Sequence, residues 1–285
     1  MMRILLIMMV PFMCLGQITP REGDPINNGM NESGSMEIKR KSPFNLEEIK
    51  VRWKKAALEN CTGVPCVVTP PAPPPAPSFT CGTSTITDVD GNAYNTVLIG
   101  TQCWTKENLK VTKYNDGTSI GDSTNSTWGT AAIGARTEYV AAGVTGYVGT
   151  FGYLYNWYAV NDPRKLCPAG WHVPTDAEWI TLTDYLNWVV PLGNVGGKMK
   201  STSSLWNAPN TGATNSSGFS ALPGGYRSSD GSFGRIRNDA FVWSATVHDY
   251  YLNDAYNRNL YFNNGIVYRN YSNKQNGFSV RCLRD

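Results

Sequence analysis

A run of prolines limits the fold of this chain more than any other feature of its sequence. Proline occupies six of the eight positions from Pro70 to Pro77. Because proline lacks a backbone N–H and fixes φ, this run is excluded from helix interiors and central strands. It extends instead as polyproline II, at about 3.1 Å per residue. We therefore expect a stiff linker over residues 69–78, with a ligand for proline-recognising domains as the alternative.

The residues after the linker have the composition of one packed domain. Residues 79–285 contain all fifteen Tyr and eight of the nine Trp of the chain, which is too much apolar surface to leave in water. Their 16 Lys/Arg balance 15 Asp/Glu, so no basic footprint for nucleic acid exists. The whole chain holds only two His, which excludes a multi-histidine metal site.

The first 16 residues have the pattern of a secretory signal peptide. Arg3 supplies a positive start, the following residues are apolar up to Met13, and Gly16 precedes polar sequence. This apolar stretch is too short to span a membrane, so we expect cleavage after Gly16 and a secreted or surface protein. A lipid anchor at Cys14 is the weaker alternative, because bulky Met13 stands where a lipoprotein signal has a small residue. No later run is long enough for a transmembrane span.

The six cysteines that remain after cleavage are interpreted as three disulfides. An even number in an exported chain is typical of a disulfide framework, although fifteen connectivities are possible. The natural pairs are Cys61 with Cys66, Cys81 with Cys103, and Cys167 with Cys282. The last pair closes a loop of over a hundred residues, nominally worth about 4–5 kcal/mol. No cysteine is then left as a nucleophile.

Residues 17–68 form a charged segment ahead of the linker. Positions 17–60 carry 8 Lys/Arg and 7 Asp/Glu, and the part up to Pro43 lacks periodicity, which predicts disorder. Asn45 and Glu48 precede apolar residues at helical spacing, which predicts a short helix over about 45–60. Because short helices are weak alone, we favour a helix that packs on its own domain over one that binds a partner.

The domain opens with a predicted hairpin and contains one well-marked helix. Alternating residues predict strands over 84–88 and 93–99 and a third at 103–104. Thr175 and Glu178 form a capping box that starts a helix. Its expected buried stripe is Trp179, Leu182, Leu186 and Val189. A weaker helix is expected over 153–160.

The C-terminal part reads as a strand meander that follows a long irregular stretch. Residues 241–283 alternate as strands do, with turns at 263–265 and 276–277. Residues 193–240 are rich in Gly, Asn and Ser and give few regular signals. Long irregular loops in compact domains are usually functional. We therefore expect any ligand to lie on this stretch and on the first turn of the meander.

Six blocks of this domain resemble one known family. The blocks are residues 102–118, 151–160, 166–179, 196–200, 205–233 and 276–285. In this order they resemble the Fibrobacter succinogenes major paralogous domain, over essentially all of 81–285. The resemblance implies an α+β, C-type lectin-like fold with short antiparallel sheets, one or two helices and long irregular loops, stapled by disulfides. That family is common in secreted and surface proteins of Bacteroidetes-type bacteria and has no established activity.

A more distant resemblance links the domain to the fold of formylglycine-generating enzymes. Those oxidases act through a pair of reactive cysteines that hold copper, whereas every cysteine here has a partner in the proposed pairing. His172 is expected to be a packed residue rather than a general base, and His248 an exposed loop residue. The Gly-x-Ser-x-Gly pattern at 117–121 does not lie between a predicted strand and a predicted helix, so no nucleophile elbow is expected. We therefore expect no enzyme activity, with the oxidase as the second alternative.

The first turn of the domain offers a weak calcium candidate. Asp88, Asp90 and Asn92 place three oxygen-bearing side chains on one turn. Real calcium sites need six to eight oxygens. We therefore interpret these residues as a hairpin turn and expect no cofactor.

What remains is a binding surface for an extracellular glycan or protein. The candidate residues are Trp206, Tyr226, Arg227, Phe233, Arg235 and Trp243, with Tyr250, Tyr251 and Tyr256 in or beside loops as well. Aromatic rings among amides and hydroxyls suit sugars and peptides alike. Tyr226 and Arg227 are the first candidates, because the preceding glycine pair allows close approach of a partner. The alternative for Tyr226 and Arg227 is a structural turn in which Arg227 binds a buried carboxylate. The alternative for the whole domain is a structural or adhesive scaffold module without a ligand site.

Overall fold

The computed structural model describes residues 78–122, 128, 132–140, 146–189 and 193–285. They belong to a unit that runs from Ala76 to Asp285. The expected signal peptide, charged segment, linker and Cys61–Cys66 pair lie outside the described residues.

One sheet of five strands joins the two ends of the domain. Its order is β1 (Thr85–Thr87), β2 (Ala93–Ile99), β3 (Gln102–Thr105), β13 (Leu283–Arg284) and β7 (Trp171–His172). The first three strands confirm the predicted hairpin and its third strand. The last strand is inserted between β3 and β7, where Leu283 lies opposite both Trp104 and His172.

A second sheet contains the predicted meander. Strands β10 (Asp239–Val247), β11 (Asp254–Tyr261) and β12 (Val267–Asn273) pair antiparallel in that order. The expected turn at 263–265 joins the last two. The expectation that the meander continues to 283 is wrong. After the turn at 276, Phe278 bridges to Tyr155 and Ser279 to Val242, so the chain crosses to the five-stranded sheet.

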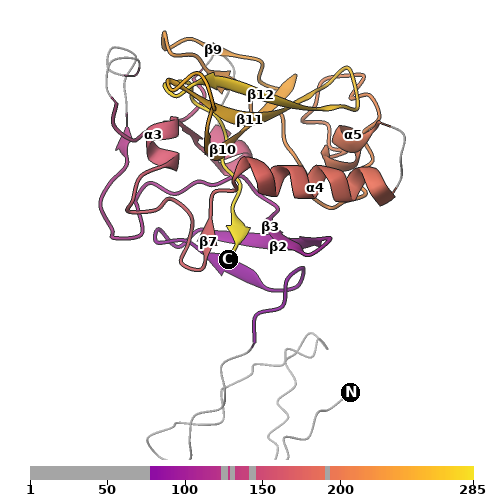
Figure 1. The fold of residues 1–285 in the computed structure, drawn as a ribbon, viewed down its shortest axis with the longest axis horizontal. Coiled ribbons are helices and arrows are strands. Elements are labelled where there is room, and N and C mark those ends of the chain that lie inside the picture. Colours follow the sequence, from indigo (N-terminus) through magenta and orange to yellow (C-terminus); the bar gives the residue numbers. More distant parts are fainter. Residues whose placement is uncertain (1–77, 123–127, 129–131, 141–145, 190–192) are drawn as a thin grey trace, which may run out of the picture. The chain divides into compact units, whose positions relative to one another are not determined.

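Helix α4 (Asp176–Val189) packs between the two sheets (Figure 1). It begins as predicted, because the Thr175 N–H donates to Glu178 Oε2 at 2.7 Å and the Glu178 N–H donates to Thr175 Oγ1 at 3.3 Å. Trp179, Leu182 and Leu186 are buried in a core that includes residues of β2, β3 and β13 on one side and of β10 and β11 on the other. The side chain of Val189 lies outside the described ones.

Residues 153–160 do not form the single helix expected from their sequence. Strand β6 (Leu154–Tyr155) pairs with β5 (Ala135–Thr137), and only α3 (Trp157–Val160) is helical. Asn156 separates the two, because its side chain accepts a hydrogen bond from the Ala159 N–H at 3.1 Å. Tertiary pairing therefore overrides local helix preference here.

The remaining elements are short. They are β4 (Gly121–Asp122), α2 (Tyr147–Phe151), α5 (Val195–Met199), β8 (Tyr226–Arg227) and β9 (Phe233–Gly234). The last three lie in the long stretch 193–240, which is otherwise irregular, as expected.

Two of the three expected disulfides lie within the described residues, and both are formed. They join Cys81 to Cys103 and Cys167 to Cys282. Together with the mixed sheets and few helices they confirm a disulfide-stapled α+β domain. No helix among the described residues is long and apolar enough to cross a membrane.

Candidate ligand-binding site

Several residues expected at a binding surface are buried instead. Trp206 is 4% exposed and its Nε1–H donates to the Ala221 carbonyl at 3.1 Å. Trp243 is fully buried and donates to the Tyr155 carbonyl at 2.8 Å. Both indoles thus have an internal hydrogen-bond partner and pack in the core, so neither ring is open to solvent.

The side chains of Arg227 and Tyr226 also pack against aromatic rings inside the domain. The buried Arg227 guanidinium lies over the Trp128 ring at 4.2 Å and the Phe233 ring at 5.1 Å. Tyr226 is half-buried and packs edge-on against Phe241 at 5.1 Å. The Arg227 side chain, one of the first ligand-contact candidates, is therefore enclosed by aromatic rings and is not open to solvent.

The glycine pair before Tyr226 allows close approach within the chain. Gly225 has φ +67°, and a Cβ there would lie 2.4 Å from the Gly234 carbonyl oxygen. A Cβ on Gly224 would lie 3.0 Å from the hydroxyl of Tyr147, which donates to the Gly224 carbonyl. The missing side chains thus make room for β9 and α2, not for a partner.

Phe233 and Arg235 complete the predicted set. Phe233 is half-buried, with its ring 5.0 Å from that of Tyr139. Arg235 is exposed, has φ +65°, and places Nε 3.6 Å from Asp239 Oδ2. Arg235 is therefore the only one of the six predicted side chains that is largely open to solvent.

Among the side chains that the structure describes, the most exposed aromatic ones lie on the turn between β10 and β11. Tyr250 is 86% exposed, Tyr251 56%, and Tyr271 on β12 42%. Tyr251 stacks on Tyr271 with ring centroids 5.4 Å apart, and Leu252 beside them is also exposed. We call Tyr250, Tyr251, Tyr256 and Tyr271, grouped around His248, the tyrosine cluster.

His248 holds this turn from beneath. It is 8% exposed, so the expectation of an exposed loop histidine is wrong. Its Nδ1 accepts the backbone N–H groups of Tyr250 at 3.2 Å and Tyr251 at 3.0 Å, which places the ring proton on Nε2. The ring packs against Tyr251 and Tyr271, with centroids 5.0 and 4.1 Å away. A single imidazole thus fixes both the backbone and the rings of the turn.

An ion-pair network ties the cluster to helix α4. Asp176, in the first turn of that helix, accepts from Arg258 at 2.7 Å and pairs with Arg269 at 2.9 Å. The Arg269 guanidinium lies 4.0 Å from the centre of the Tyr256 ring, and the Tyr256 hydroxyl donates to Asp249 at 2.8 Å. The exposed rings are therefore supported by an ion-pair network that is anchored to helix α4.

Lys274 fixes the far end of the turn. Its ammonium donates to the Leu252 carbonyl at 2.6 Å and lies over the Trp157 ring at 4.5 Å. Its backbone N–H donates to the Asn253 carbonyl at 2.9 Å. The turn is thus held by both backbone and side chain of the segment after β12.

Sequence reasoning missed part of this cluster. Tyr271 and the role of His248 were not predicted, although Tyr250, Tyr251 and Tyr256 were noted. Once the turn at 263–265 sets the register, Tyr271 falls opposite Tyr256, on the face where it meets His248. The predicted turn at 263–265 was therefore enough to place Tyr271 opposite Tyr256.

The calcium candidate forms a closed turn. Asp88 Oδ1 accepts the N–H groups of Asp90 and Asn92, and its Oδ2 accepts the Tyr94 hydroxyl at 2.6 Å. Asp90 Oδ2 accepts from the Thr112 backbone and hydroxyl. Among the described residues no group of three His, Cys, Asp or Glu could hold a metal ion. The Asp88 carboxylate is thus engaged within the hairpin, and the Asp90 carboxylate binds Thr112 outside it.

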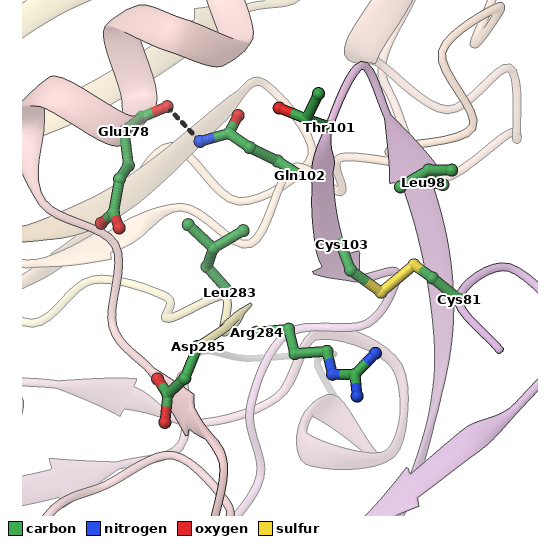
Figure 2. Close-up of a pocket in the computed structure, with 9 residues that line it drawn as sticks. All are labelled: Cys81, Leu98, Thr101, Gln102, Cys103, Glu178, Leu283, Arg284 and Asp285. Carbon is green, nitrogen blue, oxygen red and sulfur yellow. Dashed lines mark hydrogen bonds between the residues drawn. A yellow bond between two sulfur atoms is a disulfide. The ribbon is translucent and has the colours of Figure 1, made fainter. Parts of the chain in front are cut away.

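A small pocket lies beside the five-stranded sheet. It has a volume of about 350 Å³, and Figure 2 shows the Glu178 and Asp285 carboxylates on one side and the Cys81–Cys103 disulfide on the other. His172, next to it, places Nδ1 2.6 Å from Asp285 and Nε2 3.0 Å from Glu178. Both ring nitrogens of this histidine are therefore engaged by carboxylates.

Comparison with known proteins identifies the family without a function. The model of the Fibrobacter succinogenes major domain matches residues 97–284. No curated protein and no solved structure matches the chain. The chain belongs to the Fibrobacter succinogenes major domain family.

Proposed function

We propose that this chain is an exported, non-catalytic binding module that holds its ligand on the tyrosine cluster. The observation that carries the proposal is the contrast between exposed rings and a fixed turn. Tyr250 and Tyr251 are open to solvent, while His248 and Lys274 bind the backbone of the turn and Arg269 packs on the Tyr256 ring. A binding surface on a rigid base loses little conformational entropy when a ligand is bound.

The ligand class that suits this surface is an extracellular glycan or protein. Flat aromatic rings with polar tips are the side chains that recognition surfaces favour. The two disulfides and the signal-peptide pattern support export. The short sheets, long loops and disulfides also support the C-type lectin-like fold that the resemblance implies. A scaffold module without a ligand is the alternative.

The chemistry of the described residues supports a non-catalytic role. Both His172 nitrogens contact carboxylates, and Cys81, Cys103, Cys167 and Cys282 are bonded in pairs. An oxidase of the formylglycine-generating kind needs free cysteines for copper. Incubation of the full chain with copper and a cysteine-bearing sulfatase-type peptide should leave the peptide cysteine intact, and its conversion to an aldehyde would establish the oxidase alternative.

An array of glycans and extracellular proteins tests the binding role. We expect the wild-type chain to bind a defined subset of the array and the Tyr250→Ala/Tyr251→Ala variant to lose that signal. Tyr185→Ala removes an equally large, 44% exposed tyrosine on helix α4 and serves as the matched control, with signal retained. Absence of any wild-type signal would favour the scaffold alternative. Retained signal in both variants would place the ligand elsewhere, and equal loss in both would show that the loss is not specific to the tyrosine cluster.

A further inference from the structure

The three-stranded sheet has one covered edge and one open edge. On the outer side of β10, the Gly225 N–H donates to the Asp239 carbonyl at 2.9 Å and the Trp243 N–H to the Ser279 carbonyl at 3.1 Å. On the opposite side, β12 pairs only with β11 within the described part of the chain. Four consecutive residues of β12, from Tyr268 to Tyr271, are exposed.

The backbone groups on the open edge can be assigned from the hydrogen bond that follows the strand. The Lys274 N–H donates to the carbonyl of Asn253, the residue directly opposite. In an antiparallel pair such contacts occur at every second residue. Val267, Arg269, Tyr271 and Asn273 therefore direct their N–H groups outward.

A local hydrogen bond agrees with this assignment. The outward N–H of Tyr271 donates to the side chain of its neighbour, Asn270, at 2.9 Å. For Val267 and Arg269 the described residues show no bond from the outward N–H. An unpaired row of backbone groups is a template for another strand.

The strand lacks the usual protections against such pairing. Its sequence, VYRNYSN, has no proline, lysine or acidic residue, which are the features that natural edge strands use to prevent association. Its single charge, Arg269, is paired with Asp176, a carboxylate that it shares with Arg258.

The side chains of β12 complement a second copy of the same strand. Asn270 is the midpoint of Val267–Asn273, so full antiparallel overlap of two copies pairs outward residues with outward residues. Arg269 then lies opposite Tyr271, a cation beside a ring, and Tyr268 lies opposite the small Ser272. Sliding by two residues instead brings Arg269 opposite Arg269 or Tyr271 opposite Tyr271.

We propose that β12 pairs with β12 of a second copy of this chain, to form a six-stranded antiparallel sheet across a two-fold axis at Asn270. In this arrangement the tyrosine clusters of the two copies lie on the same face of the joined sheet. The Asn270 side chain must release the Tyr271 N–H, so it limits the affinity. The pairing is independent of the ligand proposed for the cluster.

Sedimentation velocity of the full chain over a concentration series tests this pairing. We expect wild type to move from monomer to dimer as concentration rises. Asn270→Lys and Asn270→Glu each bring like charges together at the axis, so each should weaken dimerisation by about tenfold or more. An equimolar mixture of the two variants should form a heterodimer. Asn270→Ala frees the Tyr271 N–H and should strengthen the dimer.

Three results would overturn the proposal. They are a wild-type chain that stays monomeric at every concentration, charged variants that dimerise as wild type does, or a mixture that fails to recover association. Because Asn270 is exposed, unchanged unfolding curves for the variants provide the folding control. Retained dimers without array binding, or array binding without dimers, separate this inference from the proposed function.

Discussion

Two regions of the domain use aromatic and cationic side chains in opposite ways. In the framework around helix α4, cations are buried: Arg281 is fully enclosed and donates to the carbonyls of Thr105 and Phe219 at 2.9 and 2.8 Å. Lys200, also fully buried, donates to the carbonyls of Thr211 in the long irregular stretch and of Tyr261 and Asn264 at the end of β11 and in the turn after it. In the tyrosine cluster the cations lie below, and the rings of Tyr250, Tyr251 and Tyr271 face solvent.

Burial lowers the pKa of both of these cations in the framework around helix α4. Loss of water around the guanidinium lowers the pKa of Arg281 to about 9, and the same effect lowers that of Lys200 to about 8. These groups remain charged at neutral pH because carbonyl oxygens replace water. They therefore hold loops that have little regular structure.

The sequence blocks that identify the family fall mainly on the framework. Lys200 lies in the block 196–200 and Arg281 in 276–285, whereas Tyr250, Tyr251 and Tyr271 lie outside all six blocks. The contrast teaches that the family resemblance describes how the domain is held together. The surface that we propose for the ligand must be judged by geometry alone.

Removing the long-range disulfide should produce the largest loss of framework stability. Cys167 and Cys282 are separated by 115 residues, so the Cys167→Ala/Cys282→Ala variant should lose about 4 kcal/mol of unfolding free energy. Denaturant unfolding under oxidising conditions measures the loss. A variant as stable as wild type would show that this bridge is not part of the framework.

Loss of the buried arginine should be nearly as severe. Arg281→Met leaves the Asn108 side chain and several buried carbonyls without a donor, which should cost about 3 kcal/mol or more. Arg281→Lys keeps the charge but loses the several N–H donors of the guanidinium, so its stability should fall between those of wild type and Arg281→Met. If Met is tolerated with less than about 1 kcal/mol lost, the guanidinium is not a structural centre.

The cap of helix α4 should contribute a smaller, pH-dependent amount. Burial alone raises the pKa of Glu178, but hydrogen bonds from Thr175 and His172 outweigh it and hold this pKa below its usual 4.5. Its contribution is therefore present above pH 4.5 and declines as pH falls through the lowered value.

Replacing the capping carboxylate isolates that contribution. Glu178→Gln should lose about 1 kcal/mol at pH 7, and its difference from wild type should shrink below pH 4. Urea unfolding at a series of pH values measures this difference. A difference that stays constant down to pH 3 contradicts the assignment.

Changes in the tyrosine cluster should have the smallest effect on stability. Tyr250 makes few contacts and is 86% exposed, so Tyr250→Ala should change the unfolding free energy by less than about 0.5 kcal/mol. His248→Ala, in contrast, removes the acceptor for two backbone N–H groups and should cost more. Equal losses in both variants would mean that the exposed ring belongs to the core.

Local sequence signals predicted the fold where hydrogen bonds are local. The hairpin, the Thr175–Glu178 capping box and the turn at 263–265 were all predicted correctly. The two described disulfides were also predicted correctly, but from the even number of cysteines and not from local hydrogen bonds. The failures occurred where distant pairing decides, as at Leu154–Tyr155, whose strand depends on β5 and on Phe278.

The candidate site was predicted only in part for a related reason. Trp206, Arg227 and Trp243 have the residue types of a binding surface, but whether a side chain points inward depends on tertiary packing. The expected region included the first turn of the meander, and the most exposed of the described aromatic side chains lie there. Burial separates Trp206, Arg227 and Trp243 from the exposed tyrosines of that turn, and sequence composition does not encode burial.

Tyrosine nitration of the full chain, with and without its strongest-binding array component, tests the central claim most directly. Without that component, Tyr250 and Tyr251 should react fastest, since they are the most exposed tyrosines among the described residues. With it, we predict protection of these two residues and of Tyr271, with unchanged reaction at Tyr185 on helix α4. Protection at Tyr226 instead, with Tyr250 and Tyr251 still reactive, would contradict the claim and return the ligand to the long loop.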